Sequence, residues 1–197
     1  MIKNFLLFLL FSVSAGTSRV AFGVFDPIIK GRVTIEEGYY RLIPEGSTKK
    51  FNLIITDELV QSRIRCLKEG DFISGNALSA NESQIQLHSI DYVGLTALFG
   101  TWRNESEIFR FDDFQNFQYW NFNKAKEHYR GPFAYHYALS PAGEELGLCS
   151  WKIFILDSVG VTLGTLEWAA DDEIFLQVYD SETGEVTSSK RLIRGVL

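Results

Sequence analysis

The sequence predicts an all-β protein made of two small barrels in tandem. Short runs of β-branched and aromatic residues recur along the chain, separated by turns that are rich in glycine, aspartate and asparagine. A helical period of apolar residues stands out near residues 57–70. From residue 98 onward, strand-like runs follow one another at short, regular spacing, which is typical of an antiparallel meander.

The first 15 residues are typical of a cleavable secretory signal and are left out of the predicted fold. Lys3 supplies a positive charge, residues 5–11 are apolar, and Val13-Ser14-Ala15 ends the segment. The apolar run is shorter than the ~20 residues that a bilayer core requires, which disfavours the alternative of an uncleaved anchor. No cysteine follows directly, so lipid attachment is not expected. We therefore expect a mature chain in the periplasm or outside the cell, with residues 16–27 as a lead-in.

Charge and cysteine content narrow the functional classes. The 197 residues carry a formal net charge of −6, whereas broad binding to phosphate backbones needs clustered lysine and arginine. Nucleic acid is therefore not an expected partner. Cys66 and Cys149 could form a disulfide in an oxidising compartment and tie the two halves together. The alternative is two buried free thiols, which behave as small apolar groups.

Residues 28–96 are predicted to form the first barrel. Runs at 28–35, 39–44 and 51–56 predict three strands, with a turn at Glu36-Glu37-Gly38. Val60, Ile64 and Leu67 then recur at helical spacing, with Thr56 or Asp57 placed to cap the helix and Gly70 to end it. Runs at 71–78 and 84–90 predict a second hairpin.

This order of elements resembles the oligonucleotide/oligosaccharide-binding (OB) barrel, and Leu67-Lys68-Glu69-Gly70-Asp71-Phe72 resembles the joint between its helix and fourth strand. The resemblance implies a five-stranded barrel with one helix that stacks bases or sugars on exposed aromatics beside basic side chains. The candidate residues are Tyr39, Tyr40, Phe51 and Phe72, with Arg41, Lys49 and Lys50 beside them. The alternative is that the rings fill the barrel and the lysines lie in a solvated loop. The net negative charge of the chain favours this alternative.

Residues 97–197 are predicted to form an antiparallel up-and-down barrel. The expected strands are residues 98–103, 107–111, 117–121, 132–139, 150–156, 161–168, 173–179 and 186–193. Alternation supports several of them, since Trp151, Ile153 and Ile155 share one face. Closure of such a meander would remove its exposed edges.

Gly100-Thr101-Trp102 resembles the Gly-x-Trp that opens the first strand of lipocalin-like barrels, and Arg191 or Arg194 could supply the arginine that packs across that tryptophan. The resemblance implies a small apolar ligand in the barrel mouth. The aromatics expected to line it are Phe109, Phe111, Tyr119, Tyr135, Tyr137 and Trp151. The alternative is that these rings pack against one another, as they do in many small barrels.

No motif in the sequence points to catalysis. His88, His128 and His136 have no metal-ligand spacing, and the acidic pairs Asp112-Asp113 and Asp171-Asp172 fall in expected turns. We therefore expect no cofactor, metal or catalytic residue. The leading hypothesis is an exported, non-enzymatic binding protein that holds a small apolar ligand or an envelope protein partner, in the second barrel or at the seam between the barrels. The alternative is nucleic-acid or glycan binding through the OB-like half.

Overall fold

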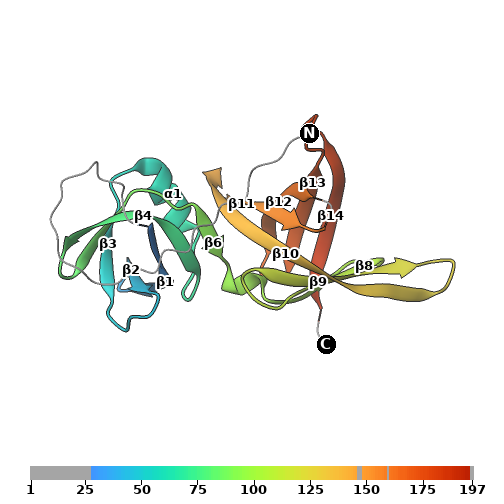
Figure 1. Cartoon of the computed structure of the whole chain (residues 1–197), viewed down its shortest axis with the longest axis horizontal. Coiled ribbons are helices and arrows are strands. Elements are labelled where there is room, and N and C mark those ends of the chain that lie inside the picture. Colours follow the sequence, from blue (N-terminus) through green and yellow to red (C-terminus); the bar gives the residue numbers. More distant parts are fainter. Residues whose placement is uncertain (1–27, 146–147, 159, 196–197) are drawn as a thin grey trace.

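The computed structural model describes residues 28–145, 148–158 and 160–195, and they form an all-β molecule with two groups of strands side by side (Figure 1). The predicted signal segment, residues 1–15, and the lead-in, residues 16–27, lie outside the described residues. Within the described ranges, no helix is both long and apolar enough to span a bilayer.

The first group of strands closes on itself. Its members are β1 (Ile28–Glu36), β2 (Tyr39–Pro44), β3 (Phe51–Ile54), β4 (Phe72–Asn81) and β5 (Gln84–Leu87). The pairing runs β1–β2–β3–β5–β4 and returns to β1, with β3 and β5 parallel and the other pairs antiparallel. Gly31 of β1 pairs with both Pro44 and Ile73, and a Cβ there would lie 2.3 Å from the Ile43 carbonyl oxygen. Glycine therefore lets β1 contact both neighbours at once.

Helix α1 (Glu58–Arg65) lies between β3 and β4 in the chain. Asp57 caps it, because its Oδ1 accepts a 2.9 Å hydrogen bond from the Val60 amide. Val60 and Ile64 are buried in the core, as their spacing predicts. The helix ends at Arg65, and Cys66 follows as its C-cap, which brings a cysteine to the edge of the first barrel.

The second group is a closed, eight-stranded antiparallel barrel. Its strands are β7 (Gly100–Arg103), β8 (Glu107–Phe111), β9 (Asn116–Asn123), β10 (His128–Glu145), β11 (Leu148–Leu156), β12 (Val161–Ala170), β13 (Glu173–Tyr179) and β14 (Val186–Gly195). Each strand pairs with the next, and β14 returns to β7 through pairs such as Arg194 with Trp102. The predicted meander is therefore correct. β10 extends well beyond the expected 132–139, because it pairs with β9 on one side and with β11 on the other.

A short strand, β6 (Tyr92–Gly94), joins the two barrels. It pairs with β4 of the first barrel, and Val93 pairs with Leu139 of β10 in the second. The 3₁₀ helix η1 (Thr96–Leu98) follows, and the buried Asp71 carboxylate accepts 2.8 Å hydrogen bonds from the amide and hydroxyl of Thr96. Burial outweighs these hydrogen bonds and raises the pKa of Asp71. The two barrels thus share the backbone pairing of β6, and Asp71 holds the linker η1 against the first barrel.

Candidate functional site

One end of the second barrel is sealed by Trp102 and Arg194. Trp102 is fully buried, and its indole nitrogen donates a 2.8 Å hydrogen bond to the Leu98 carbonyl in η1. The Arg194 guanidinium lies 4.3 Å from the ring centroid and donates to the carbonyls of Phe99 and Ala97 at 2.9 and 2.5 Å. Arg191 instead lies outside and pairs with Glu173, because neighbours an odd number of positions apart on a strand face opposite sides. Trp102 and Arg194 therefore cover this end of the barrel with a buried ring and a guanidinium that is held by two carbonyls.

The barrel interior is packed with the rings that the sequence nominated as ligand-binding. Phe111 meets Tyr137 edge-on at 5.1 Å, and Phe109 lies 5.0 Å from Tyr119. Tyr135 stacks on Phe117 at 5.2 Å. These rings contact one another across β8, β9 and β10, as the alternative interpretation expects of a small barrel. Of the six nominated residues, Tyr119 borders a pocket at the opposite end of the barrel and Trp151 borders a pocket at the seam.

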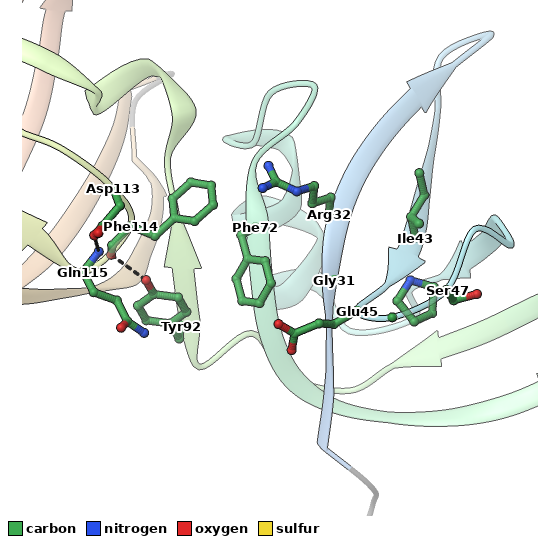
Figure 2. A pocket seen from close by; sticks show the side chains of 12 residues that line it. Gly31, Arg32, Ile43, Glu45, Ser47, Phe72, Tyr92, Asp113, Phe114 and Gln115 are labelled. Carbon is green, nitrogen blue, oxygen red and sulfur yellow. Dashed lines mark hydrogen bonds between the residues drawn. The ribbon is translucent and has the colours of Figure 1, made fainter.

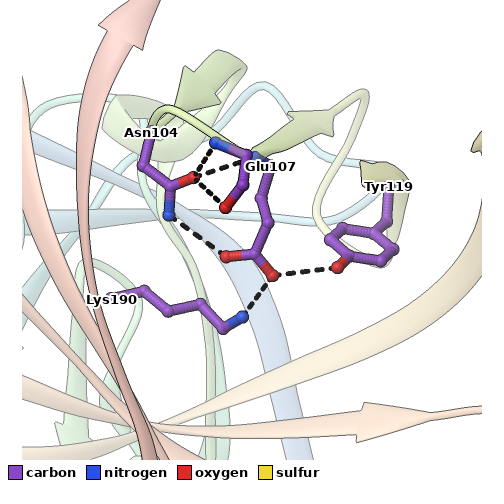
Figure 3. Close-up of polar contacts among 5 residues, drawn as sticks. Asn104, Glu107, Tyr119 and Lys190 are labelled. Atoms are coloured by element: carbon purple, nitrogen blue, oxygen red, sulfur yellow. Dashed lines mark hydrogen bonds and ion pairs between the residues drawn. The ribbon is translucent and has the colours of Figure 1, made fainter. Parts of the chain in front are cut away.

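A polar cluster occupies the end opposite Trp102 (Figure 3). The Glu107 carboxylate pairs with Lys190 and accepts hydrogen bonds from the Tyr119 hydroxyl at 2.8 Å and the Asn104 amide at 3.1 Å. The side chain of Glu107 is only 13 % exposed. Burial alone would raise its pKa, but the hydrogen bonds from Lys190, Asn104 and Tyr119 prevail, and the pKa is lowered. Glu107 is thus a satisfied, ionised group that fixes this end of the barrel.

Cys66 and Cys149 are joined by a disulfide with a Cα–Cα distance of 5.5 Å. The bond connects the C-cap of α1 in the first barrel to β11 in the second. Together with β6 it holds the two barrels against each other, and it forms part of the wall of a pocket between them.

The pocket beside this disulfide, here called the seam pocket, has a volume of about 300 Å³. The first barrel and its linker contribute the buried side chains of Leu67 and Leu95, and the second contributes Trp151 and Trp168. Trp168 meets the sealing Trp102 edge-on at 6.5 Å, so the pocket lies directly behind the closed end of the second barrel. Its lining is mainly apolar, with a few polar groups at the rim, as in most small-molecule sites.

Charged side chains stand at the rim of the seam pocket. Lys68 of the first barrel and Asp171 of the second approach to 3.7 Å, and both are largely exposed. A pair of this kind contributes little to stability, since water screens it.

The sequence analysis nominated Trp151 and the two cysteines, but it did not identify Trp168, Leu67 and Leu95 as residues of this pocket. The disulfide was the available signal, because residues next to two bonded cysteines must meet.

A second crevice separates the barrels on another side (Figure 2). It has a volume of about 480 Å³, and Phe72, Tyr92 and Phe114 form its aromatic wall. Arg32 lies 5.4 Å above the Phe114 ring, while the Tyr92 hydroxyl donates a 2.6 Å hydrogen bond to the Phe114 carbonyl. Burial raises the pKa of Tyr92 to about 12. Because Phe72 packs against Tyr92 and Phe114 here, it supports the seam between the barrels.

The other nominated residues of the first barrel lie mostly around Glu36. Arg41 and Lys50 both pair with the Glu36 carboxylate, and Lys49 lies 5.0 Å above the Phe51 ring. Tyr39 is 69 % exposed, whereas Tyr40 is half-buried against the core. The positive charge of this face is therefore partly neutralised by an adjacent acid.

In the described part of the chain, no group of three or more histidine, cysteine, aspartate or glutamate side chains could hold a metal ion. Of the paired aspartates, Asp113 accepts hydrogen bonds from the amides of Gln115 and Asn116, and Asp171-Asp172 form the turn between β12 and β13. Comparisons with models of protein families, with curated proteins and with solved structures find no match to this chain.

Proposed function

We propose that this protein is an exported, non-enzymatic binding protein that holds a small apolar ligand in the seam pocket. The observation that carries the proposal is the pocket itself, about 300 Å³ of mainly apolar space bordered by Trp151 and Trp168. Small-molecule sites combine such walls with a few polar groups at the edge, and Lys68 and Asp171 occupy that position. A ligand there would contact both barrels, so its binding would also strengthen the interface between them.

A fluorescent apolar probe tests the proposal. N-phenyl-1-naphthylamine should bind the native protein saturably, with one site per chain, and should quench tryptophan emission. Ala169→Trp places an indole at an exposed position that lines the pocket and should abolish binding. Ala134→Trp, at an exposed position of β10, is the matched control and should bind the probe normally. Equal binding by both variants, or no saturable binding by the native chain, would refute the proposal.

The proposed export rests on the charged, apolar and small-residue order of residues 1–15. Expression of the full chain in a secreting host should give an exported protein whose N-terminus lies near Gly16. An exported fraction that still begins at Met1 would refute cleavage.

We infer further that the first barrel is OB-like and the second lipocalin-like. The order β1–β2–β3–β5–β4–β1 with α1 between β3 and β4 supports the first inference. The sealing of Trp102 by Arg194 supports the second. The OB-like inference keeps nucleic-acid or glycan binding as a second candidate function, favoured by the exposed ring of Tyr39, whose register partner Glu36 forms an ion pair with Lys50. Salt-dependent retention on single-stranded DNA that Tyr39→Ala abolishes would support it, and no retention at low salt would exclude it.

A further inference from the structure

The outer surface of the second barrel carries a groove over β7, β8, β9 and β10 that is separate from the seam pocket. It has a volume of about 350 Å³ and is bordered by Thr101, Arg103, Ile108, Arg110, Trp120 and Tyr129. These residues share the outer face because Trp102 and Phe109, their neighbours along β7 and β8, are buried inside the barrel. Gly195 of β14 also borders the groove, and a Cβ there would lie 3.4 Å from the Thr101 methyl group. Glycine keeps this part of the groove free of side-chain atoms.

The groove combines aromatic rings with two arginines. Trp120 lies under the Arg110 guanidinium at 5.9 Å, and Tyr129 is 40 % exposed. Arg110 also pairs with Asp112, whereas Arg103 makes no ion pair within the described residues. The residues that border the groove include no carboxylate, although the chain as a whole carries a net charge of −6. This surface is therefore suited to a ligand that has an apolar face and a negative charge.

We propose that this groove binds an acidic oligosaccharide whose sugar rings carry carboxylate groups. The C–H face of a pyranose ring packs on the Trp120 and Tyr129 rings, and a carboxylate receives paired hydrogen bonds from the Arg103 guanidinium. Single-stranded DNA carries a similar charge per sugar ring, and it is therefore the competitor that distinguishes the two kinds of ligand.

Calorimetric titration of the folded chain with trigalacturonic acid tests this site, with maltotriose as the uncharged counterpart. The acidic trisaccharide should bind, and maltotriose should bind at least tenfold more weakly. Arg103→Gln should weaken binding roughly tenfold by removing a charge-assisted contact. Lys152→Gln, an exposed position on β11, is its matched control and should bind like the native chain.

Two further variants separate recognition from general packing. Trp120→Ala should weaken binding roughly tenfold, while Phe175→Ala, which removes a ring from the outer face of β13, should leave it unchanged. Far-ultraviolet circular dichroism spectra of all variants should match that of the native chain, which shows that they fold.

Any of three results would overturn the proposal. They are no heat of binding with trigalacturonic acid, equal affinity for maltotriose, and equal affinity in Arg103→Gln and Lys152→Gln. Displacement of the trisaccharide by single-stranded DNA at lower concentration would also overturn it and assign the groove to nucleic acid.

Discussion

The two barrels fill their interiors with different kinds of side chain. The first has five strands, includes the parallel pair β3–β5, and buries aliphatic side chains such as Val33, Leu42 and Ile73. The second has eight antiparallel strands, and large rings such as Trp102 and Trp151 occupy its interior. Barrel diameter grows with strand number, so the wider lumen needs larger side chains to fill it. The interior aromatic rings are thus needed to fill the barrel, and their presence alone does not indicate a binding site.

Trp102→Ala tests this difference most severely. Removal of a fully buried indole should cost about 3–5 kcal/mol of the free energy of unfolding, since it also leaves Arg194 without the ring that it covers. Leu42→Ala in the first barrel should cost about 2–5 kcal/mol. Urea unfolding followed by far-ultraviolet circular dichroism measures both. Arg191→Ala is the control and should leave the midpoint unchanged, and a Trp102→Ala midpoint equal to that of the control would contradict a packed interior.

Removal of the disulfide tests how strongly the barrels depend on each other. The double variant Cys66→Ser with Cys149→Ser should lose about 2–5 kcal/mol, because the bond closes a loop between residues 83 positions apart. Unfolding should also separate into two transitions, one for each barrel. Intrinsic fluorescence reports the second barrel, which holds Trp102, Trp120, Trp151 and Trp168, while circular dichroism reports both. A single transition at the native midpoint would show that β6 and Asp71 hold the seam without the bond.

Glu107→Gln addresses the polar end of the second barrel. Loss of the ion pair with Lys190 should cost about 1–3 kcal/mol at pH 7, since charged hydrogen bonds are lost. The folded pKa of Glu107 lies below its usual value of 4.5, so its contribution is present above pH 4.5 and is lost as the pH falls through the folded pKa. The difference in stability between native and Glu107→Gln proteins should therefore shrink below pH 4.5. Urea midpoints from pH 7 to pH 3 measure this, and a constant difference would contradict it.

The smallest effect is expected at Glu36 of the first barrel. Glu36→Gln removes the partner of both Arg41 and Lys50, whose side chains are 28 % and 47 % exposed, so water screens the two pairs and the free energy of unfolding should fall by less than about 1 kcal/mol. The variant should elute earlier from an anion-exchange column at pH 7, because it carries one negative charge fewer than the native chain. A clear fall in the midpoint would show that this cluster has a structural role.

Local patterns in the sequence predicted much of the fold. The spacing of Val60 and Ile64 and the position of Asp57 predicted α1, since caps and helical faces depend on residues a few positions apart. The alternation of inward and outward side chains along β14 also distinguishes Arg194 from Arg191 as the arginine that packs on Trp102. Leu192 faces inward, and Arg194, two positions further along, therefore lies on the same face. β6 was missed because a three-residue strand has no period of its own, and its identity depends on β4 and β10.

The sequence by itself determined the class of the molecule, the eight strands of the meander and the residues that could seal it, because these follow from periodicity and turn chemistry between near neighbours. Only the tertiary structure decided which candidates meet. It joined Cys66 to Cys149, filled the barrel with the rings expected to bind a ligand, and placed Leu67 beside Trp168 at the seam. The ring contacts depend on how one barrel closes, and the other two depend on how the two barrels pack against each other. No local pattern encodes the relative placement of residues that lie far apart in the chain, such as Cys66 and Cys149, which are 83 positions apart.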